Sequence, residues 1–255
     1  MKPCTLYSLL AVLLLGMATP AQSQKKIFKS LDASMVLVKG GQFNMGESQY
    51  DNPPQETVSK GHPVAVSDYY ISKYEVTQTL WTAVMGSNPS KFNTCAECPV
   101  ENVSYDSAMV FIEKLNQATK KKYRLPTSAE WEYAARGGSL SKGYRLSGGD
   151  NENNEVAWTS TKSTQPVGTK QANELGLFDM SGNVFELCSD WIGERPDPKK
   201  LVTNPVGPAT GEYKVLRGGC WNFPWYYSAI VYISTAKPDK KDPYQGFRLA
   251  KSVEP

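Results

Sequence analysis

YRLPTSAEWEYAARGG, residues 123–138, is the stretch that decides the fold, because it contains both ends of a short helix. Thr127 can accept a hydrogen bond from the amide of Glu130, while the Glu130 carboxylate reaches back to the Thr127 amide, which is a reciprocal helix start. The glycine pair at the end of the stretch stops the pattern. The sequence therefore predicts a scaffold helix from Thr127 to Arg136.

Two further helices precede this stretch. The first has Thr77 as its cap and ends at Gly86, and the second begins near Ser104. Apolar side chains recur at helical spacing in both: Leu80, Trp81, Val84 and Met85 in the first, and Ala108, Phe111, Ile112 and Leu115 in the second. Between Met35 and Asp68, short apolar runs broken by glycine and proline pairs predict β-strands joined by turns.

The chain after Gly138 has a different character. Helical spacing disappears, and segments rich in Gly, Asn, Pro and aromatic residues leave only short strand candidates at Val215–Arg217 and Phe247–Ala250. Loops of this length are uncommon in a compact domain. Because buried backbone groups need hydrogen-bond partners, we expect metal ions, disulfides or buried polar networks to hold this half of the chain.

The composition limits the class of protein. The net charge is only +3 and the lysines are scattered, so no nucleic-acid partner is expected. Lys2 followed by the apolar run Leu9–Met17 predicts an export signal over residues 1–23, and no other segment is long enough to span a membrane. We expect one domain over residues 24–255, secreted or periplasmic in the bacterial cell envelope.

Four cysteines remain after the predicted signal, in a compartment where disulfides persist. Cys95 and Cys98 could form a redox pair, half of a zinc site, or a disulfide that closes a local loop. No strand precedes them and no helix begins at them, which favours the loop disulfide. Cys220 could be a lone nucleophile, but a buried thiol or a disulfide with Cys188 is the preferred interpretation.

A series of short motifs runs along nearly all of the mature chain. Besides residues 123–138 they are GQFNMG (41–46), YEVT (74–77), PVENVS (99–104), GLFDMSGNVFE (176–186), VLRGG (215–219) and GFR (246–248). In order and content they resemble the formylglycine-generating enzyme, or sulfatase-modifying factor, family. The resemblance implies an irregular α+β fold related to C-type lectins, with low regular secondary-structure content and bound calcium.

The resemblance also implies a structural calcium site on the loop from Asp179 to Glu186. Its implied ligands are the side chains of Asp179 and Glu186 and the backbone carbonyls of Gly182 and Val184. Calcium prefers six to eight oxygen ligands, so this set is chemically reasonable. Alternatively, the two carboxylates only cap and brace the loop. The family's second calcium loop is shortened here, and Asn151–Val156 is interpreted as a polar loop.

The sequence departs from the family at its catalytic copper site. Members that make formylglycine bind copper through two cysteines, whose positions here are Phe223 and Ser228. A phenyl ring cannot ligate copper and an alcohol is a poor ligand for it, so copper is not expected. Cys220 is a weak alternative catalytic candidate. Another branch of the family uses iron held by three histidines, whereas this chain has only His62, for which we expect a structural role.

Aromatic residues replace the catalytic site. Some must belong to the core, but the exposed ones would form a binding surface from this set: Trp221, Phe223, Trp225, Tyr226, Tyr227 and Tyr232. One hypothesis is a calcium-stabilised, non-catalytic binding or envelope-assembly module whose ligand is a protein, a peptide or a glycan. The other is an oxidoreductase that makes formylglycine in an exported sulfatase through Cys220 or the Cys95 and Cys98 pair. Loss of both copper ligands beside intact scaffold motifs favours the first.

Overall fold

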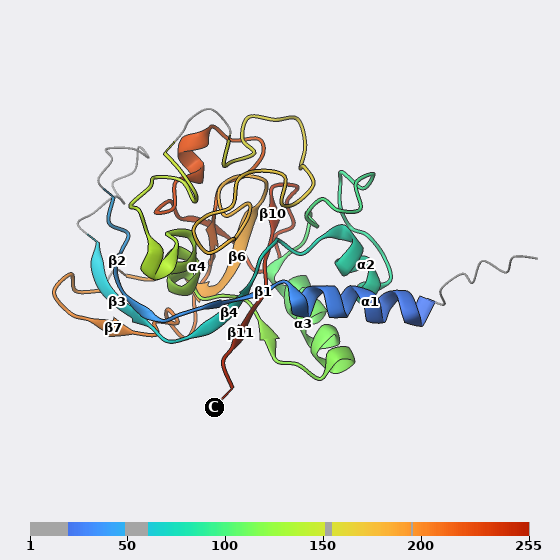
Figure 1. Ribbon diagram of the computed structural model, residues 1–255, viewed down its shortest axis with the longest axis horizontal. Helices are drawn as coiled ribbons and strands as arrows, with labels where there is room; N and C mark the ends of the chain where they lie inside the picture. Colours follow the sequence, from blue (N-terminus) through green and yellow to red (C-terminus); the bar gives the residue numbers. More distant parts are fainter. Residues whose placement is uncertain (1–19, 49–60, 151–154, 195, 255) are drawn as a thin grey trace, which may run out of the picture.

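In the computed structural model, which describes residues 20–48, 61–150, 155–194 and 196–254, short strands form three separate sheets (Figure 1). The first sheet has the order β1 (Met35–Val38), β4 (Tyr69–Ser72), β11 (Ala250–Ser252) and β5 (Tyr123–Arg124). The second has the order β10 (Gln245–Gly246), β6 (Phe185–Trp191), β8 (Lys214–Arg217) and β9 (Ser234–Ala236). The third has the order β2 (Gly41–Met45), β3 (His62–Val66) and β7 (Val202–Thr203).

The three predicted helices are confirmed as α2 (Gln78–Met85), α3 (Tyr105–Thr119) and α4 (Ser128–Ala135). The predicted helix start is present at α4, where the Glu130 amide donates to the Thr127 hydroxyl at 3.1 Å and the Thr127 amide donates to the Glu130 carboxylate at 2.9 Å. Two short 3₁₀ turns, η1 (Gly138–Leu140) and η2 (Trp225–Ser228), lie in the second half.

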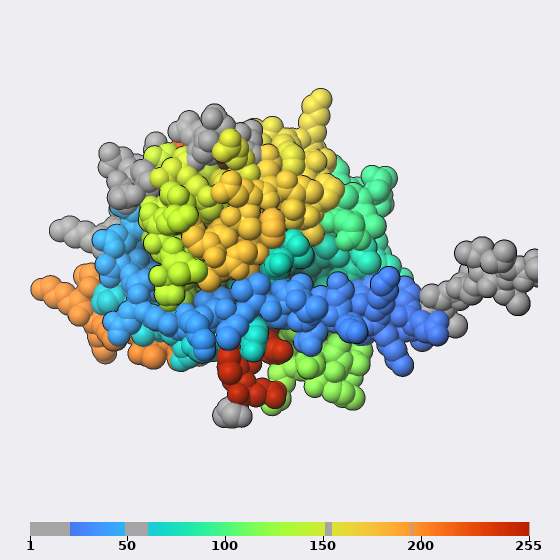
Figure 2. Space-filling model, in the orientation of Figure 1, coloured from blue at the N-terminus to red at the C-terminus, as the bar shows by residue number. Residues whose placement is uncertain are grey.

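An additional helix, α1 (Pro20–Ala33), begins inside the segment predicted as an export signal. The rest of that segment, residues 1–19, lies outside the described residues. Leu31 of α1 is buried in the core, and the Gln24 amide donates to the Ala83 carbonyl of α2 at 2.6 Å. Figure 2 shows the N-terminal segment, in blue, crossing one face of the molecule. Helix α1 therefore packs on the domain through residues that follow the predicted signal.

The core is built where the helices meet the C-terminal motif. The ring of Trp81 stacks on Phe111 at 5.2 Å, and Phe247 meets both rings edge-on, which joins α2, α3 and the chain end. Helix α4 packs against β2 and β3 on one side and contacts β6 and β8 on the other. Its Trp131 is fully buried. The stretch 123–138 thus forms the helix that contacts all three sheets, since Tyr69 of β4 and Arg124 of β5 also bond to Glu130.

Two expectations for the second half need correction. Strand β6 was not predicted, although with seven residues it is the longest strand among those described. Its polar residues Glu186 and Asp190 are buried with partners, which hides the strand pattern in the sequence. The predicted strand Phe247–Ala250 is wrong, because β10 ends at Gly246 and β11 begins at Ala250. Within the described ranges, none of the helices combines the length and apolar character needed to cross a bilayer.

Candidate functional site

The two positions implied as copper ligands lie in the segment after β8. Phe223 is half-buried, and its ring packs against Phe185, Tyr227 and Tyr244 at centroid distances of 5.7, 5.2 and 5.8 Å. Ser228 is fully buried at the end of η2, and within the described residues its hydroxyl oxygen has no hydrogen-bond partner. Neither side chain supplies a thiolate, so this pair of positions cannot hold copper as two cysteines would.

The aromatic side chains proposed as a binding surface are less exposed than such a surface requires. Trp221 and Tyr232 are buried, so their assignment to the surface is corrected. The other four are half-buried: Phe223, Trp225, Tyr226 and Tyr227. Along η2 the ring of Tyr226 contacts those of Trp225 and Tyr227, at 5.9 and 4.7 Å, and Phe223 contacts Tyr227. The segment is therefore mainly an aromatic cluster that fills space, with one side open to solvent.

A pocket of about 750 Å³ opens beside this cluster and is here named the Phe223 pocket. Apolar side chains of neighbouring strands lie in it, Phe185 from β6 and Leu216 from β8, next to the rings of Phe223 and Tyr244. Charged side chains come from the segment after β9: Lys237, Asp239, Lys240, Lys241 and Asp242. The volume is in the range of ligand sites in proteins. The arrangement suits a ligand with an apolar part and a charged part.

The free thiols do not provide a replacement nucleophile. Cys220 is buried, and burial raises the pKa of its thiol to about 12, although the amides of Asn222 and Phe223 favour the thiolate. Burial also raises the pKa of Cys188 well above its usual value. Both thiols are free, so the disulfide between them considered from the sequence is wrong. Because the thiolate is the reactive form, these residues are poorly suited to catalysis.

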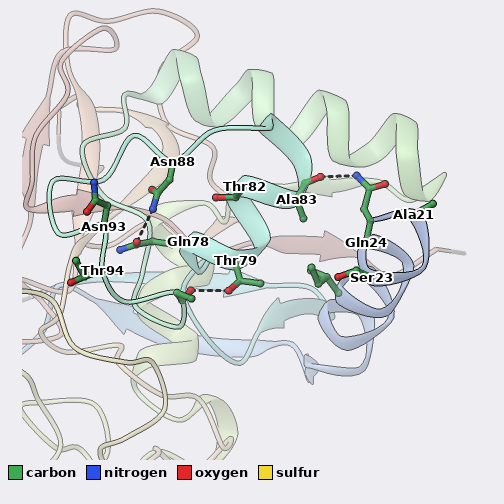
Figure 3. A pocket seen from close by; sticks show the side chains of 12 residues that line it. Ala21, Ser23, Gln24, Gln78, Thr79, Thr82, Ala83, Asn88, Asn93 and Thr94 are labelled. Carbon is green, nitrogen blue, oxygen red and sulfur yellow. Dashed lines mark hydrogen bonds between the residues drawn. The ribbon is translucent and has the colours of Figure 1, made fainter. Parts of the chain in front are cut away.

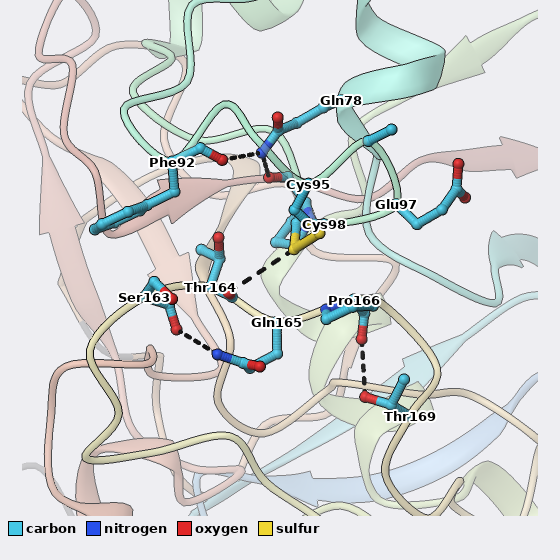
Figure 4. The surroundings of a disulfide bond; sticks show 12 residues. Gln78, Phe92, Cys95, Glu97, Cys98, Ser163, Thr164, Gln165, Pro166 and Thr169 are labelled. Atoms are coloured by element: carbon cyan, nitrogen blue, oxygen red, sulfur yellow. Dashed lines mark hydrogen bonds between the residues drawn. A yellow bond between two sulfur atoms is a disulfide. The ribbon is translucent and has the colours of Figure 1, made fainter.

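Cys95 and Cys98 form a disulfide in the loop after α2 (Figure 4). The Thr79 amide donates to the Ala96 carbonyl at 2.9 Å, and the Val167 amide donates to the Glu97 carbonyl at 3.0 Å. Cys98 is buried beside the segment around Thr164. The disulfide thus lies where one loop bridges α2 and a second loop.

The proposed calcium loop contains buried carboxylates. Glu186 is fully buried, and the Arg248 guanidinium donates to both of its oxygens at 2.6 Å, while the Trp131 indole donates to one at 2.7 Å. One oxygen of Asp179 accepts from the Gly168 amide at 2.7 Å, whereas the other, also buried, lacks a hydrogen-bond partner among the described residues. Burial raises the pKa of Asp179 to about 6, although the Gly168 amide opposes this effect.

Glu75, which lies in the YEVT motif, is buried next to this loop. No role for it was predicted from the sequence. It accepts from the Asn183 side chain at 2.7 Å and from the Val184 amide at 3.2 Å. Burial, and next the charge of Asp179, raise the pKa of Glu75 well above its usual value. Arg248 is a buried cation that acts on all three carboxyl groups, so the carboxyl groups outnumber it here.

The fit to calcium depends on these oxygens. The unpartnered Asp179 oxygen is a suitable donor, and a carboxylate such as Glu186 keeps a lone pair after three hydrogen bonds. Within the described ranges, however, no three side chains of the Asp, Glu, His and Cys types are placed to hold a metal together. A calcium ion here would therefore need the backbone carbonyls of Gly182 and Val184 as well. His62, the single histidine, lies in β3 opposite Met45.

A family model for the sulfatase-modifying factor enzyme 1-like domain matches residues 21–253. The chain belongs to this family. It is 32% identical to the chaperone protein LppX of Paenibacillus barcinonensis, over 86% of this chain and 89% of that one. It is 26% identical to the formylglycine-generating enzyme of Thermomonospora curvata, over 91% and 96% of the two chains. The serine/threonine-protein kinase pkn1 of Chlamydia pneumoniae is 30% identical, but the match spans 38% of its length.

The solved structures agree with the family. Treponema denticola variable protein 1 matches this sulfatase-modifying-factor-like chain with a TM-score of 0.76 and 30% identity, over 86% of this chain and 95% of that one. The predicted family and the predicted α+β fold class are therefore confirmed.

Proposed function

We propose that this sulfatase-modifying-factor-like chain is a non-catalytic module that binds a polypeptide partner in the Phe223 pocket. The observation that carries the proposal is the state of the two copper positions, where Phe223 packs among three aromatic rings and Ser228 is buried. A copper site of the kind that the resemblance implies needs a thiolate at each of the two positions, and neither position has one. The nearby Cys220 is buried with a raised pKa, which weighs against the alternative of a formylglycine-forming oxidoreductase.

The chemistry of the pocket supports a polypeptide ligand. Aromatic and aliphatic side chains can receive an apolar side chain, and the lysines and aspartates after β9 can bind charged groups beside it. Strand β9 is at the end of its sheet and lines the same pocket, so a bound segment could pair with its backbone. Similarity to a protein called a chaperone over most of both chains is a further argument for a protein-binding role.

Calcium is proposed as a structural ion and not as part of any reaction. Asp179, Glu186 and the carbonyls of Gly182 and Val184 would hold it, and Glu75 would lie beside it. Its charge would offset the excess of buried carboxylates around Arg248. Export to the bacterial envelope is proposed from the apolar run Leu9–Met17 alone.

The first test concerns catalysis. Purified protein is incubated with copper, oxygen and a peptide that contains Cys-x-Pro-x-Arg, and the mass of the peptide cysteine is followed. We expect no conversion, while the Thermomonospora curvata enzyme in parallel converts the peptide. Conversion by the wild-type chain would overturn the proposal, and the Cys220→Ser variant would then show whether that thiol is used.

The second test concerns binding. An array of peptides that combine apolar and charged residues is probed with the wild-type chain and with Phe223→Ala, and we expect the variant to lose most of the signal. Phe43→Ala is the matched control, because Phe43 is also half-buried and packs on one tyrosine, Tyr133 at 5.3 Å, away from the pocket. Equal signals from the two variants would remove the Phe223 pocket as the binding site.

A further inference from the structure

A second pocket, of about 740 Å³, lies between α1, α2 and the loop that contains the disulfide (Figure 3). It is separate in its lining from the Phe223 pocket. Its lining residues are Ala21, Ser23, Gln24, Ile27, Gln78, Thr79, Thr82, Ala83, Asn88, Asn93, Thr94 and Ala96. We name it the amide pocket, because glutamine and asparagine side chains reach it from all three elements.

The lining of the amide pocket is uncharged, and most of its exposed area is apolar. Eight of its twelve lining residues have an amide or hydroxyl side chain, and no described residue in the lining carries a charge. The Phe223 pocket, in contrast, has five charged residues in its lining. Amide side chains donate and accept, and hydroxyls do both as well. A ligand matched to this lining is therefore uncharged, with apolar surface beside groups that both donate and accept.

The polar groups at the base of the pocket are held in place. The buried Gln78 amide donates to the Phe92 carbonyl at 3.0 Å and to the Pro99 carbonyl at 3.3 Å, and its oxygen accepts from Asn88 at 2.8 Å. Gln24 ties α1 to α2 through the Ala83 carbonyl, as Figure 3 shows. The shape of the pocket is thus fixed before a ligand arrives, which lowers the entropic cost of binding.

Other polar groups of the pocket are available. The side chains of Thr82, Asn93 and Thr94 are exposed and, within the part of the chain that the structure describes, make no hydrogen bond to protein. Asn93 and Thr94 immediately precede Cys95, whose disulfide to Cys98 closes the same loop. The amide pocket therefore combines a fixed base with unused donors and acceptors on a braced loop.

We propose that the amide pocket binds a neutral carbohydrate. Sugar hydroxyls donate and accept at short intervals, which matches a lining of amides and hydroxyls, and a neutral sugar needs no charged partner. The small apolar residues Ala21, Ala83 and Ala96, with Ile27, can contact the C–H face of a sugar ring. An acidic ligand would lack a cation in this lining, and a basic one would lack an anion.

The test is titration of the purified protein with a panel of neutral oligosaccharides of glucose, galactose, mannose and N-acetylglucosamine. We expect at least one oligosaccharide to bind with a Kd of about a millimolar or lower. The double variant Thr82→Ala with Asn93→Ala should weaken this binding about tenfold, the effect of losing two hydrogen bonds. Both side chains are exposed and unbonded, so the variant should keep the wild-type melting temperature. Ala21 and Ser23 lie before the predicted cleavage site, so the titration is made with residues 1–23 present and again without them. Both substituted residues belong to α2 and its loop and are present in either form.

Gln42→Ala is the matched control, since Gln42 is an exposed amide on β2 that does not line the pocket. The double variant Cys95→Ser with Cys98→Ser should also weaken sugar binding, because the loop that contains Asn93 and Thr94 loses its disulfide. The proposal is overturned if no member of the panel binds, if the Thr82 and Asn93 variant binds as the wild type does, or if an acidic oligosaccharide competes at the same site with higher affinity.

Discussion

Two regions of this domain bury side chains of opposite kinds. In the polar frame, defined here as the pairs Glu132 with Arg217 and Glu186 with Arg248, all four side chains are fully buried ions. The segment from Trp221 to Tyr232 contains no charged residue and is held by contacts between rings. The frame supports the segment directly, because Arg217 donates to the carbonyls of Ile230 and Tyr232 at 3.2 and 3.4 Å.

The difference teaches that the residues supporting the fold are separate from those at the implied copper positions. Burial alone would raise the pKa of Glu132, but Arg136 and Arg217 outweigh it and lower that pKa, so each ion of the pair depends on the other. The Phe223 side chain is held by contacts with the rings around it and not by an ion pair. The segment can therefore change its chemistry while the frame keeps the backbone in place.

The largest loss of stability is expected for Arg217→Met, which removes one ion of the polar frame. The variant leaves Glu132 buried with Arg136 alone and removes the ties to the aromatic segment, so we expect the free energy of unfolding to fall by about 3–5 kcal/mol. Urea unfolding measures it, and Lys122→Ala, which removes an exposed pair with Glu254, should change little. A loss for Arg217→Met as small as that of the control would show that the frame does not support the fold.

A smaller effect is expected from Phe223→Ala. A fully buried phenylalanine costs about 3–5 kcal/mol on truncation, and because Phe223 is half-buried we expect about 2 kcal/mol. The melting transition should stay cooperative, since the polar frame is untouched. Calorimetry measures the transition. A non-cooperative transition would mean that the stability of the polar frame depends on the packing of the aromatic segment.

How far the sequence could predict these two regions depends on the separation of the partners. The start of α4 was predictable because Thr127 and Glu130 are three residues apart. Glu186 and Arg248 are 62 residues apart, and Glu75 and Asn183 are 108 apart, so spacing could not reveal either contact.

In the aromatic segment, the residue types are visible in the sequence but the burial of each side chain is not. Trp221 is covered by Phe92 and Tyr244, which come from distant loops. The candidate surface was therefore predictable as a region and not as a set of exposed side chains.

The next prediction concerns the Cys95–Cys98 disulfide, which lies outside both regions. Replacing both cysteines, Cys95→Ser with Cys98→Ser, should lower the free energy of unfolding by about 2 kcal/mol, because the closed loop is short and constrains the unfolded chain only modestly. Urea unfolding with and without a reductant measures it, and the reductant should affect only the wild type. An equal response of the double variant to the reductant would place the effect elsewhere.

The smallest effect concerns pH and the proposed calcium ion beside Glu186. Asp179 has a pKa of about 6 when folded against an ordinary value of 3.8, so its contribution to stability is full below the lower value and is lost as pH rises through about 6. Without calcium, we expect the free energy of unfolding to fall by about 1 kcal/mol from pH 5 to pH 7 through this group.

Calcium binds the ionised carboxylate, so millimolar calcium should stabilise the protein more at pH 7 than at pH 5. Urea unfolding at both pH values, with calcium or with a chelator, measures the difference. Asp179→Asn keeps the side-chain shape without the titration and should remove this part of the pH dependence, even though Glu75 and Asp190, whose pKa values are also raised, remain. If calcium stabilises neither protein at either pH, Arg248 alone balances these carboxylates, and the polar frame holds the loop without a metal.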